Sequence, residues 1–179
     1  MGNRNIRLQE VRSPCARHIL LRKRHRPHGI MSDIIRVRAA AEEDIPAIAE
    51  LEQRCFSSPW SERALLDTLQ SPHAHLVCAE QNGTVIAYGG LYLLGDDADI
   101  TNIATHPDMR RRGAAAAVLE TLRIYAKEHG ATALHLEVRA SNTGAIALYE
   151  TRGFQTDGIR KNYYKNPTEH AILMTCALS

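Results

Sequence analysis

Residues 103–116 read Ile-Ala-Thr-His-Pro-Asp-Met-Arg-Arg-Arg-Gly-Ala-Ala-Ala. This stretch combines the end of an apolar strand, a turn forced by Pro107, three arginines and a helix expected to begin at Gly113. The first N–H groups of a helix have no partner within it, and the helix dipole makes that end positive, so anions bind there. Small residues also let a ligand come close to the backbone. The stretch therefore predicts a site for an anion such as a pyrophosphate, although an Ala-rich helix after a solvated basic turn explains it equally well.

The hydrophobic pattern on both sides of this stretch predicts a mixed α/β sheet with helices packed on it. Apolar residues recur at spacings of three and four in the helices and alternate in the strands. Asn82-Gly83 predicts a hairpin turn, and Gly89-Gly90 predicts a bulge or a close backbone approach within a strand. The expected helices cover 41–56, a segment capped by Ser61, 114–129 and 143–152, and the expected strands cover 35–38, 75–80, 85–94, 99–105, 134–138, 154–159 and 171–177.

Length and charge divide the chain into two parts. The 179 residues suit one domain, since domains usually have about 100–200 residues. Residues 1–30 hold eight Lys and Arg but one acid, so they carry +7, and the rest carries −5 because the total is +2. We therefore expect a basic, mostly disordered extension over 1–30 and one folded domain over 31–179. An organelle-targeting peptide and a nucleic-acid-binding tail are the alternatives for the extension, and Met31 is a second candidate for the natural start.

Composition argues against several classes of protein. No apolar run approaches the ~20 residues needed to cross a bilayer, so we expect no membrane-spanning segment. The four cysteines are scattered without a Cys-x-x-Cys pair, so we expect reduced thiols, no disulfide framework and no metal site. These features favour a cytoplasmic protein.

Three residues downstream of the basic stretch are candidates for chemistry. Glu137 alternates with Leu136 and Val138, so it points to the other face at the end of a strand, where ligands often bind. A surface carboxylate is its simpler interpretation. Asn142 is expected to cap the following helix, and Tyr149 lies on the apolar face of that helix, where a core tyrosine is the simpler interpretation. None of the three identifies a reaction by itself.

The order of these segments resembles a known family. Arg110, Gly113 and Ala115 match the acyl-CoA motif of the GNAT superfamily, Arg/Gln-x-x-Gly-x-Gly/Ala. The chain from about Ile34 to its C-terminus also resembles the RimI family within that superfamily, which implies a mixed, mostly antiparallel central sheet with helices on both faces. The matching segments are Pro-Trp-Ser at 59–61, Leu-Glu-Val-Arg-Ala-Ser-Asn at 136–142, Ala-Leu-Tyr-Glu-x-x-Gly-Phe at 147–154 and Arg-x-Asn-Tyr-Tyr at 160–164.

The resemblance implies an enzyme that uses acetyl-CoA as co-substrate and needs no metal. The backbone of Ile103, Ala104 and Thr105 would hydrogen-bond the pantetheine arm as an added strand does, and Asn142 would also contact CoA. The loop and the helix start would hold the pyrophosphate through Arg111, Arg112, Gly113, Ala114, Ala115 and Ala116.

The resemblance also implies the reaction, because the RimI family acetylates the N-terminal alanine of the eighteenth protein of the small ribosomal subunit. Glu137 would be the general base and Tyr149 the general acid. Two alternatives remain open. One is a GNAT enzyme that acts on other protein N-termini, lysines or a small-molecule amine. The other is a CoA-binding or RNA-associated module in which the basic extension matters more than catalysis.

The acceptor site rests on fewer residues. Trp60 and the pair Tyr163-Tyr164 belong to aromatic segments expected in loops, of a kind that grips an extended peptide end. Glu52 is a candidate for neutralising a basic N-terminus, with an exposed helix residue as its simpler interpretation. The expected partner is therefore a ribosomal protein N-terminus, with no membrane and with nucleic acid contacted only through the extension.

Overall fold

The computed structural model describes residues 20–21 and 34–178. The strands of this part of the chain are β1 Leu20–Leu21, β2 Ile35–Ala39, β3 Ala74–Gln81, β4 Thr84–Leu94, β5 Asp97–Thr105, β6 Ala133–Arg139, β7 Gln155–Tyr164 and β8 Glu169–Ala177. Its helices are α1 Ile45–Cys55, α2 Glu62–Leu69, α3 Ala114–Glu128 and α4 Thr143–Glu150, with 3-10 turns at Glu42–Asp44 and Pro107–Met109.

The described strands form one sheet in the order β1-β2-β3-β4-β5-β6-β8-β7. Every neighbouring pair is antiparallel except β5 and β6, which are parallel. The hairpin between β3 and β4 turns at Asn82-Gly83, as the sequence predicts. The mixed, mostly antiparallel sheet is confirmed.

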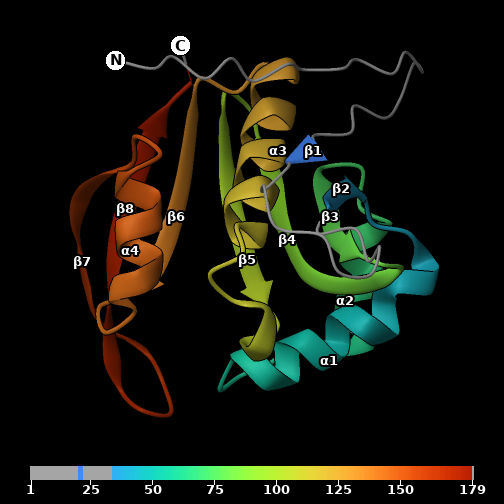
Figure 1. Cartoon of the computed structure of the whole chain (residues 1–179). Coiled ribbons are helices and arrows are strands. Elements are labelled where there is room, and N and C mark those ends of the chain that lie inside the picture. Colours follow the sequence, from blue (N-terminus) through green and yellow to red (C-terminus); the bar gives the residue numbers. More distant parts are fainter. Residues whose placement is uncertain (1–19, 22–33, 179) are drawn as a thin grey trace, which may run out of the picture.

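Helices cover both faces of this sheet (Figure 1). Neighbouring residues of a strand point to opposite faces, and in β3 Val77 and Cys78 accordingly belong to different apolar cores. The Val77 core includes side chains of α3 and α4, namely Val118, Leu119, Leu122 and Tyr149. The Cys78 core includes side chains of α1 and α2, namely Ile48, Leu51 and Leu65.

The two adjacent glycines of β4 allow close packing on both faces. A Cβ atom at Gly89 would lie 2.6 Å from Cγ1 of Val118, so α3 packs directly on the strand backbone. A Cβ atom at Gly90 would overlap the side chain of Leu76. The register between β4 and β5 also shifts between Gly90 and Leu91. The predicted close approach is therefore confirmed, whereas the extra residue of the irregularity is Thr101 on the neighbouring strand β5.

The feature that positions the site is a split between β5 and β6. These strands pair only from Asp97↔Ala133 to Asp99↔His135. Beyond that point β5 continues to pair with β4 as far as Thr105, and β6 continues to pair with β8 as far as Arg139. The strands therefore diverge, as Figure 1 shows, and the last part of β5 presents a backbone edge that no other described strand pairs with.

Three expectations from the sequence change in detail. The helix expected over 41–56 begins as the 3-10 turn Glu42–Asp44 and becomes α1 only at Ile45. The strand expected over 154–159 extends to Tyr164, because the β7–β8 hairpin keeps pairing up to Tyr164↔Glu169. Tyr163 and Tyr164, expected in a loop, therefore lie at the end of a strand. Of residues 1–30 the structure describes only Leu20–Leu21, which pairs with β2. The prediction of a basic, mostly disordered extension over 1–30 otherwise lies outside the described residues.

The described part of the chain contains neither a membrane helix nor a metal-binding cluster. None of its helices is both long and apolar enough to cross a membrane. Nowhere among these residues do three His, Cys, Asp or Glu side chains gather as a metal ion would require. Cys55, Cys78 and Cys176 are free thiols.

Candidate active site

The loop before α3 has an unusual backbone. Arg111 and Gly113 both have positive φ, 62° and 92°, a conformation that costs a non-glycine residue energy and is common at functional sites. The first backbone bond of α3 runs from the Ala117 N–H to the Gly113 carbonyl, at 3.0 Å. No side chain caps the helix at Gly113. The N–H groups of the first turn, on Ala114, Ala115 and Ala116, have no intrahelical partner.

Positive charge surrounds this helix start. Arg110 donates from Nε to the Thr105 carbonyl at 3.5 Å, and Arg112 donates from Nη2 to the Asp108 carbonyl at 3.4 Å. Both contacts are exposed and long, so the guanidinium groups keep most of their donors available. A Cβ atom at Gly113 would meet nothing within 4 Å, so open space lies over the backbone there. This backbone and these arginines are consistent with the anion site predicted from the sequence, which stays a prediction.

The residues predicted to contact a pantetheine arm lie on the free edge of β5. Ile103, Ala104 and Thr105 pair with β4 on one side only. An extended ligand can add to such an edge through backbone hydrogen bonds. Asn142 lies across the split, after β6, where its Oδ1 accepts from the Ala145 N–H at 3.2 Å and caps α4. The N-cap interpretation of Asn142 is therefore confirmed, and its side chain remains exposed beside the split.

Glu137 projects from β6 on the face away from Leu136 and Val138, as the alternation predicts. Its carboxylate forms an ion pair with Arg160 at 2.5 Å, and its side chain is 29% exposed. It also accepts a hydrogen bond from the Tyr163 hydroxyl and thereby raises the pKa of that group. The carboxylate is thus held by two residues of β7 rather than lying unpaired in solvent.

Tyr149 is buried in the core between α4 and the sheet, 8% exposed, with its ring 5.7 Å from that of Phe154. Its hydroxyl makes no hydrogen bond to any other described residue, and burial raises its pKa to about 12. Tyr164 lies near both candidates: its hydroxyl donates to the Glu137 carbonyl at 3.0 Å. Burial, together with the negative charge of Glu137, raises the pKa of Tyr164 to about 12.

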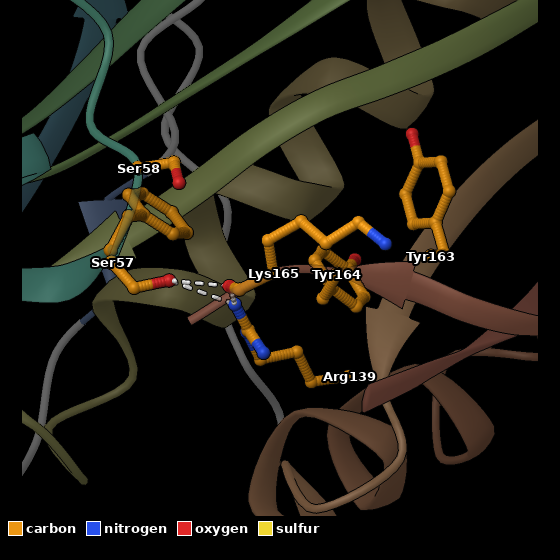
Figure 2. A pocket seen from close by; sticks show the side chains of 7 residues that line it. Ser57, Ser58, Arg139, Tyr163, Tyr164 and Lys165 are labelled. Carbon is orange, nitrogen blue, oxygen red and sulfur yellow. Dashed lines mark hydrogen bonds between the residues drawn. The ribbon is translucent and has the colours of Figure 1, made fainter. Parts of the chain in front are cut away.

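A cavity of about 290 Å³ opens beside these residues (Figure 2). Two of the three predicted acceptor residues, Tyr163 and Tyr164, line it, whereas Trp60 does not. The other lining residues, which sequence reasoning missed, are Phe56, Ser57, Ser58, Arg139 and Lys165. Of these five residues only Arg139 lies within a segment that matches the family, 136–142, so it is the only one that the sequence could have indicated.

The structure agrees with neither of the interpretations of Glu52, which were an exposed helix residue and a group that neutralises a basic N-terminus. Its side chain is fully buried, at 0% exposure, so it neither faces solvent nor meets an incoming substrate. Its carboxylate accepts hydrogen bonds from the Tyr88 hydroxyl, from Asn102 Nδ2 at 2.7 Å and from the Trp60 N–H at 2.7 Å. The buried carboxylate therefore ties α1 and the Trp60 loop to the end of β5, next to Ile103.

Comparison with known proteins agrees with this geometry. Residues 45–154 match the model of the acetyltransferase (GNAT) family. The ribosomal protein bS18-alanine N-acetyltransferase of Escherichia coli is 39% identical over 138 residues, 76% of this chain and 93% of that protein. The N-alpha-acetyltransferase RimI of Mycobacterium tuberculosis is 34% identical over 137 residues, 73% of this chain and 85% of that protein.

A solved structure supports the same assignment. The crystal structure of the ribosomal-protein-S18-alanine N-acetyltransferase from Escherichia coli superposes with a TM-score of 0.75 at 37% identity, covering 81% of this chain and 94% of that one. The chain therefore belongs to the GNAT acetyltransferase family. Within that family, similar relatives carry the name of ribosomal protein S18-alanine N-acetyltransferases.

Proposed function

We propose that this protein transfers the acetyl group of acetyl-CoA to the α-amino group of the N-terminal alanine of ribosomal protein bS18. The observation that carries the proposal is the split between β5 and β6. The split leaves the edge of β5 unpaired, and the chain runs from that edge to the basic start of α3, while β6 on the other side of the split carries Glu137. The choice of acceptor follows the relatives, which are named for this reaction.

Acetyl-CoA fits the split as an extended ligand with an anionic end. The pantetheine arm would hydrogen-bond the backbone of Ile103, Ala104 and Thr105, and Asn142 would contact it from the opposite side. The N–H groups and guanidinium groups from Arg111 to Ala116 would hold the pyrophosphate, because the helix dipole and the arginines both favour negative charge there.

Glu137 would act as the general base. An α-amino group has a pKa near ~8, so at neutral pH most of it is protonated and unable to attack. The ammonium group displaces Arg160 from the Glu137 carboxylate, which then accepts the proton directly or through a water. The amine nitrogen attacks the thioester carbon, and the backbone N–H groups near Ile103–Thr105 stabilise the oxyanion.

Tyr149 would act as the general acid. When the C–S bond breaks, its hydroxyl gives a proton to the departing CoA thiolate. The raised pKa of about 12 keeps this phenol protonated at neutral pH. Its lack of a hydrogen-bond partner among the described residues leaves the proton available for the leaving group.

The proposal is tested by an acetyl-CoA assay against a set of peptides. The set contains the first residues of bS18 beginning with alanine, the same peptide beginning with serine, glycine or methionine, and an N-terminally blocked peptide with an internal lysine. We expect the alanine peptide to have the highest kcat/KM. Faster acetylation of the blocked lysine peptide, or of a peptide with another first residue, would contradict the proposal and indicate a GNAT enzyme with another acceptor.

A further inference from the structure

The acceptor cavity is built from three segments that are distant in the sequence. Ser57 and its neighbours follow α1, Arg139 ends β6, and Tyr163 to Lys165 end β7 and begin the turn to β8. The loop after α1 and the β7–β8 turn belong to no common strand pairing. Something other than the sheet must therefore set the width of the cavity.

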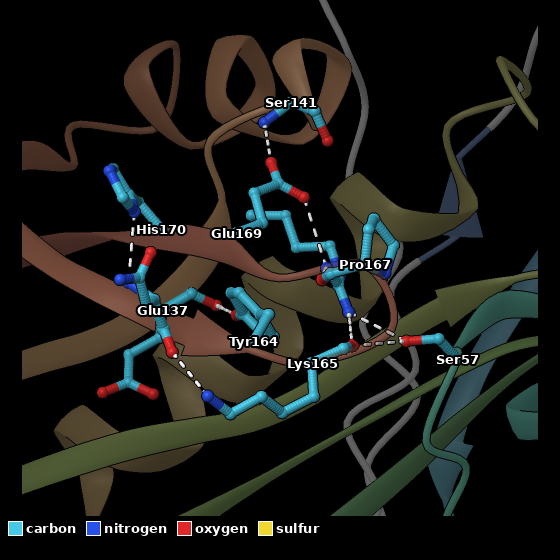
Figure 3. Close-up of polar contacts among 10 residues, drawn as sticks. Ser57, Glu137, Ser141, Tyr164, Lys165, Pro167, Glu169 and His170 are labelled. Carbon is cyan, nitrogen blue, oxygen red and sulfur yellow. Dashed lines mark hydrogen bonds and ion pairs between the residues drawn. The ribbon is translucent and has the colours of Figure 1, made fainter.

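Arg139 supplies most of that connection (Figure 2), and Figure 3 shows Ser57, Lys165, Pro167 and Glu169 around the same point. Ser57 Oγ also donates directly to the Lys165 carbonyl at 3.4 Å. Its Nη2 donates to Ser57 Oγ at 2.8 Å and to the Lys165 carbonyl at 3.0 Å. Its Nη1 donates to the Pro167 carbonyl at 3.3 Å and to a Glu169 carboxylate oxygen at 3.2 Å. A planar guanidinium can serve several acceptors in fixed directions, whereas a lysine ammonium is a single point of charge.

The same residue also relates the cavity to the proposed catalytic base. Its guanidinium lies 4.4 Å from the centre of the Tyr164 ring, and the hydroxyl of that ring donates to the Glu137 carbonyl. Glu169 in turn accepts from the Ser141 N–H at 2.5 Å. Tyr164 is thus held at its face by Arg139 and at its hydroxyl by Glu137, two residues on the same face of β6. Both walls of the cavity therefore take their position from the strand that carries Glu137.

We propose that Arg139 is a positioning residue of the acceptor site, which fastens the loop after α1 and the β7–β8 turn to the end of β6. This inference rests on the proposed function. An acceptor peptide bound between these walls is placed at a fixed distance from Glu137. Loss of the connection lets the walls separate and weakens acceptor binding, while the free edge of β5 and the start of α3 stay unchanged.

The test compares Arg139→Gln, Arg139→Lys and Ser57→Ala in the full chain with Arg123→Gln as control. Arg123 is a partly exposed arginine paired with a carboxylate, Glu120, on α3 and outside the cavity. We expect KM for the alanine peptide to rise roughly 10-fold or more in both Arg139 variants, since small misplacements near a reacting group are costly. KM for acetyl-CoA should stay within about twofold of wild type.

The Ser57→Ala variant tests the contact between Arg139 and the loop after α1. It should raise KM for the peptide, and its effect should be smaller in the Arg139→Gln background because the contact between Ser57 and Arg139 is already lost there, while the longer contact from Ser57 Oγ to the Lys165 carbonyl remains. A wild-type peptide KM in Arg139→Lys would overturn the proposal. Equal increases of KM for peptide and for acetyl-CoA would also overturn it, because they indicate general loosening.

A second readout does not depend on the reaction. Hydrogen exchange of the segments 56–61 and 163–168, measured without substrates, should be faster in the Arg139 variants and in Ser57→Ala but not in Arg123→Gln. Unchanged exchange in these segments would overturn the proposal. If the wild-type protein acetylates no alanine peptide, the proposed function fails, and hydrogen exchange still decides the role of Arg139. If Arg139→Gln does not fold, Arg139→Lys and Ser57→Ala decide it.

Discussion

Glu137 owes its setting to residues that lie more than twenty positions away in the sequence. Arg160 and Tyr163 reach it from β7, and its own backbone carbonyl receives the Tyr164 hydroxyl. These contacts fix the direction of the carboxylate before a substrate arrives. As the proposed base, Glu137 would exchange the guanidinium group of Arg160 for the ammonium group of the acceptor.

Replacing Glu137 by glutamine tests its role as the base. The amide cannot accept the ammonium proton, so turnover should fall by roughly 10²–10⁴-fold, the usual contribution of acid–base catalysis. The dissociation constant of acetyl-CoA, measured by calorimetry, should remain near the wild-type value because Glu137 lies across the split from the start of α3. Glu150→Gln, an exposed position at the end of α4, is the control. Unchanged turnover in Glu137→Gln would show that Glu137 is not the general base.

Replacing Tyr149 by phenylalanine separates the general acid from a core tyrosine. The change keeps the ring packed against Phe154 and removes a hydroxyl that has no described hydrogen-bond partner. Stability should therefore change by less than about 1 kcal/mol, while kcat should fall roughly 10²-fold or more. Tyr125→Phe, in a tyrosine that packs against the same core on α3, should leave kcat unchanged. Normal turnover in Tyr149→Phe would show that Tyr149 is a core residue and not the general acid.

The pH dependence of the wild-type enzyme gives the same residue a second check. The acid form of a phenol exists below its pKa, and the pKa of Tyr149 is about 12. Its contribution to kcat should therefore persist as pH rises past the ordinary tyrosine value of about 10. A tyrosine with the ordinary pKa would lose its proton about two pH units lower, and kcat would then begin to fall near pH 10.

Single residues in this site were predictable from the sequence only where a matched segment contained them. Glu137 and Tyr149 could be selected in this way. The roles of Arg139 and Arg160 could not, because they depend on which strands are neighbours and in which register. Glu52 was misjudged for the same reason: its partners Tyr88 and Asn102 lie on strands that the helical pattern around it does not reveal.

At the level of elements, periodicity predicts where strands and helices occur but not where a strand pair ends. The sequence indicates a strand over 99–105 and another over 134–138, and both are present. They pair over only three residues, and beyond that point each strand keeps only the partner on its other side. The sequence therefore did not predict the split, in which we propose that the cofactor binds.

The start of α3 can be tested through its glycine. Gly113 has φ of +92°, so an alanine there is strained by about 1–2 kcal/mol although it has open space. Gly83→Ala is a matched control, since Gly83 also has positive φ and open space but lies in the distant β3–β4 turn. We expect both variants to lose similar stability in urea titrations, and only Gly113→Ala to weaken acetyl-CoA binding. Equal acetyl-CoA affinity in the two variants would place the pyrophosphate elsewhere.

At the scale of the whole molecule, the split divides the sheet into two parts joined by three residue pairs. One part, β1 to β5, carries the free edge and the start of α3. The other, β6 to β8 with α4, carries Glu137, Tyr149 and Asn142. A ligand that hydrogen-bonds β5 and also contacts Asn142 connects the two parts, so its binding should stabilise the entire fold.

Thermal unfolding measures this connection. At a concentration of acetyl-CoA 100 times its dissociation constant, the folded state gains ~2.7 kcal/mol. For a chain of this size that corresponds to an increase in Tm of roughly 5–10 °C. Acetyl-pantetheine at the same concentration can occupy the edge of β5 but lacks the pyrophosphate, so its shift should be much smaller. Equal shifts for the two ligands would mean that the basic loop before α3 does not bind the pyrophosphate, and no shift for either would mean that the split is not the cofactor site.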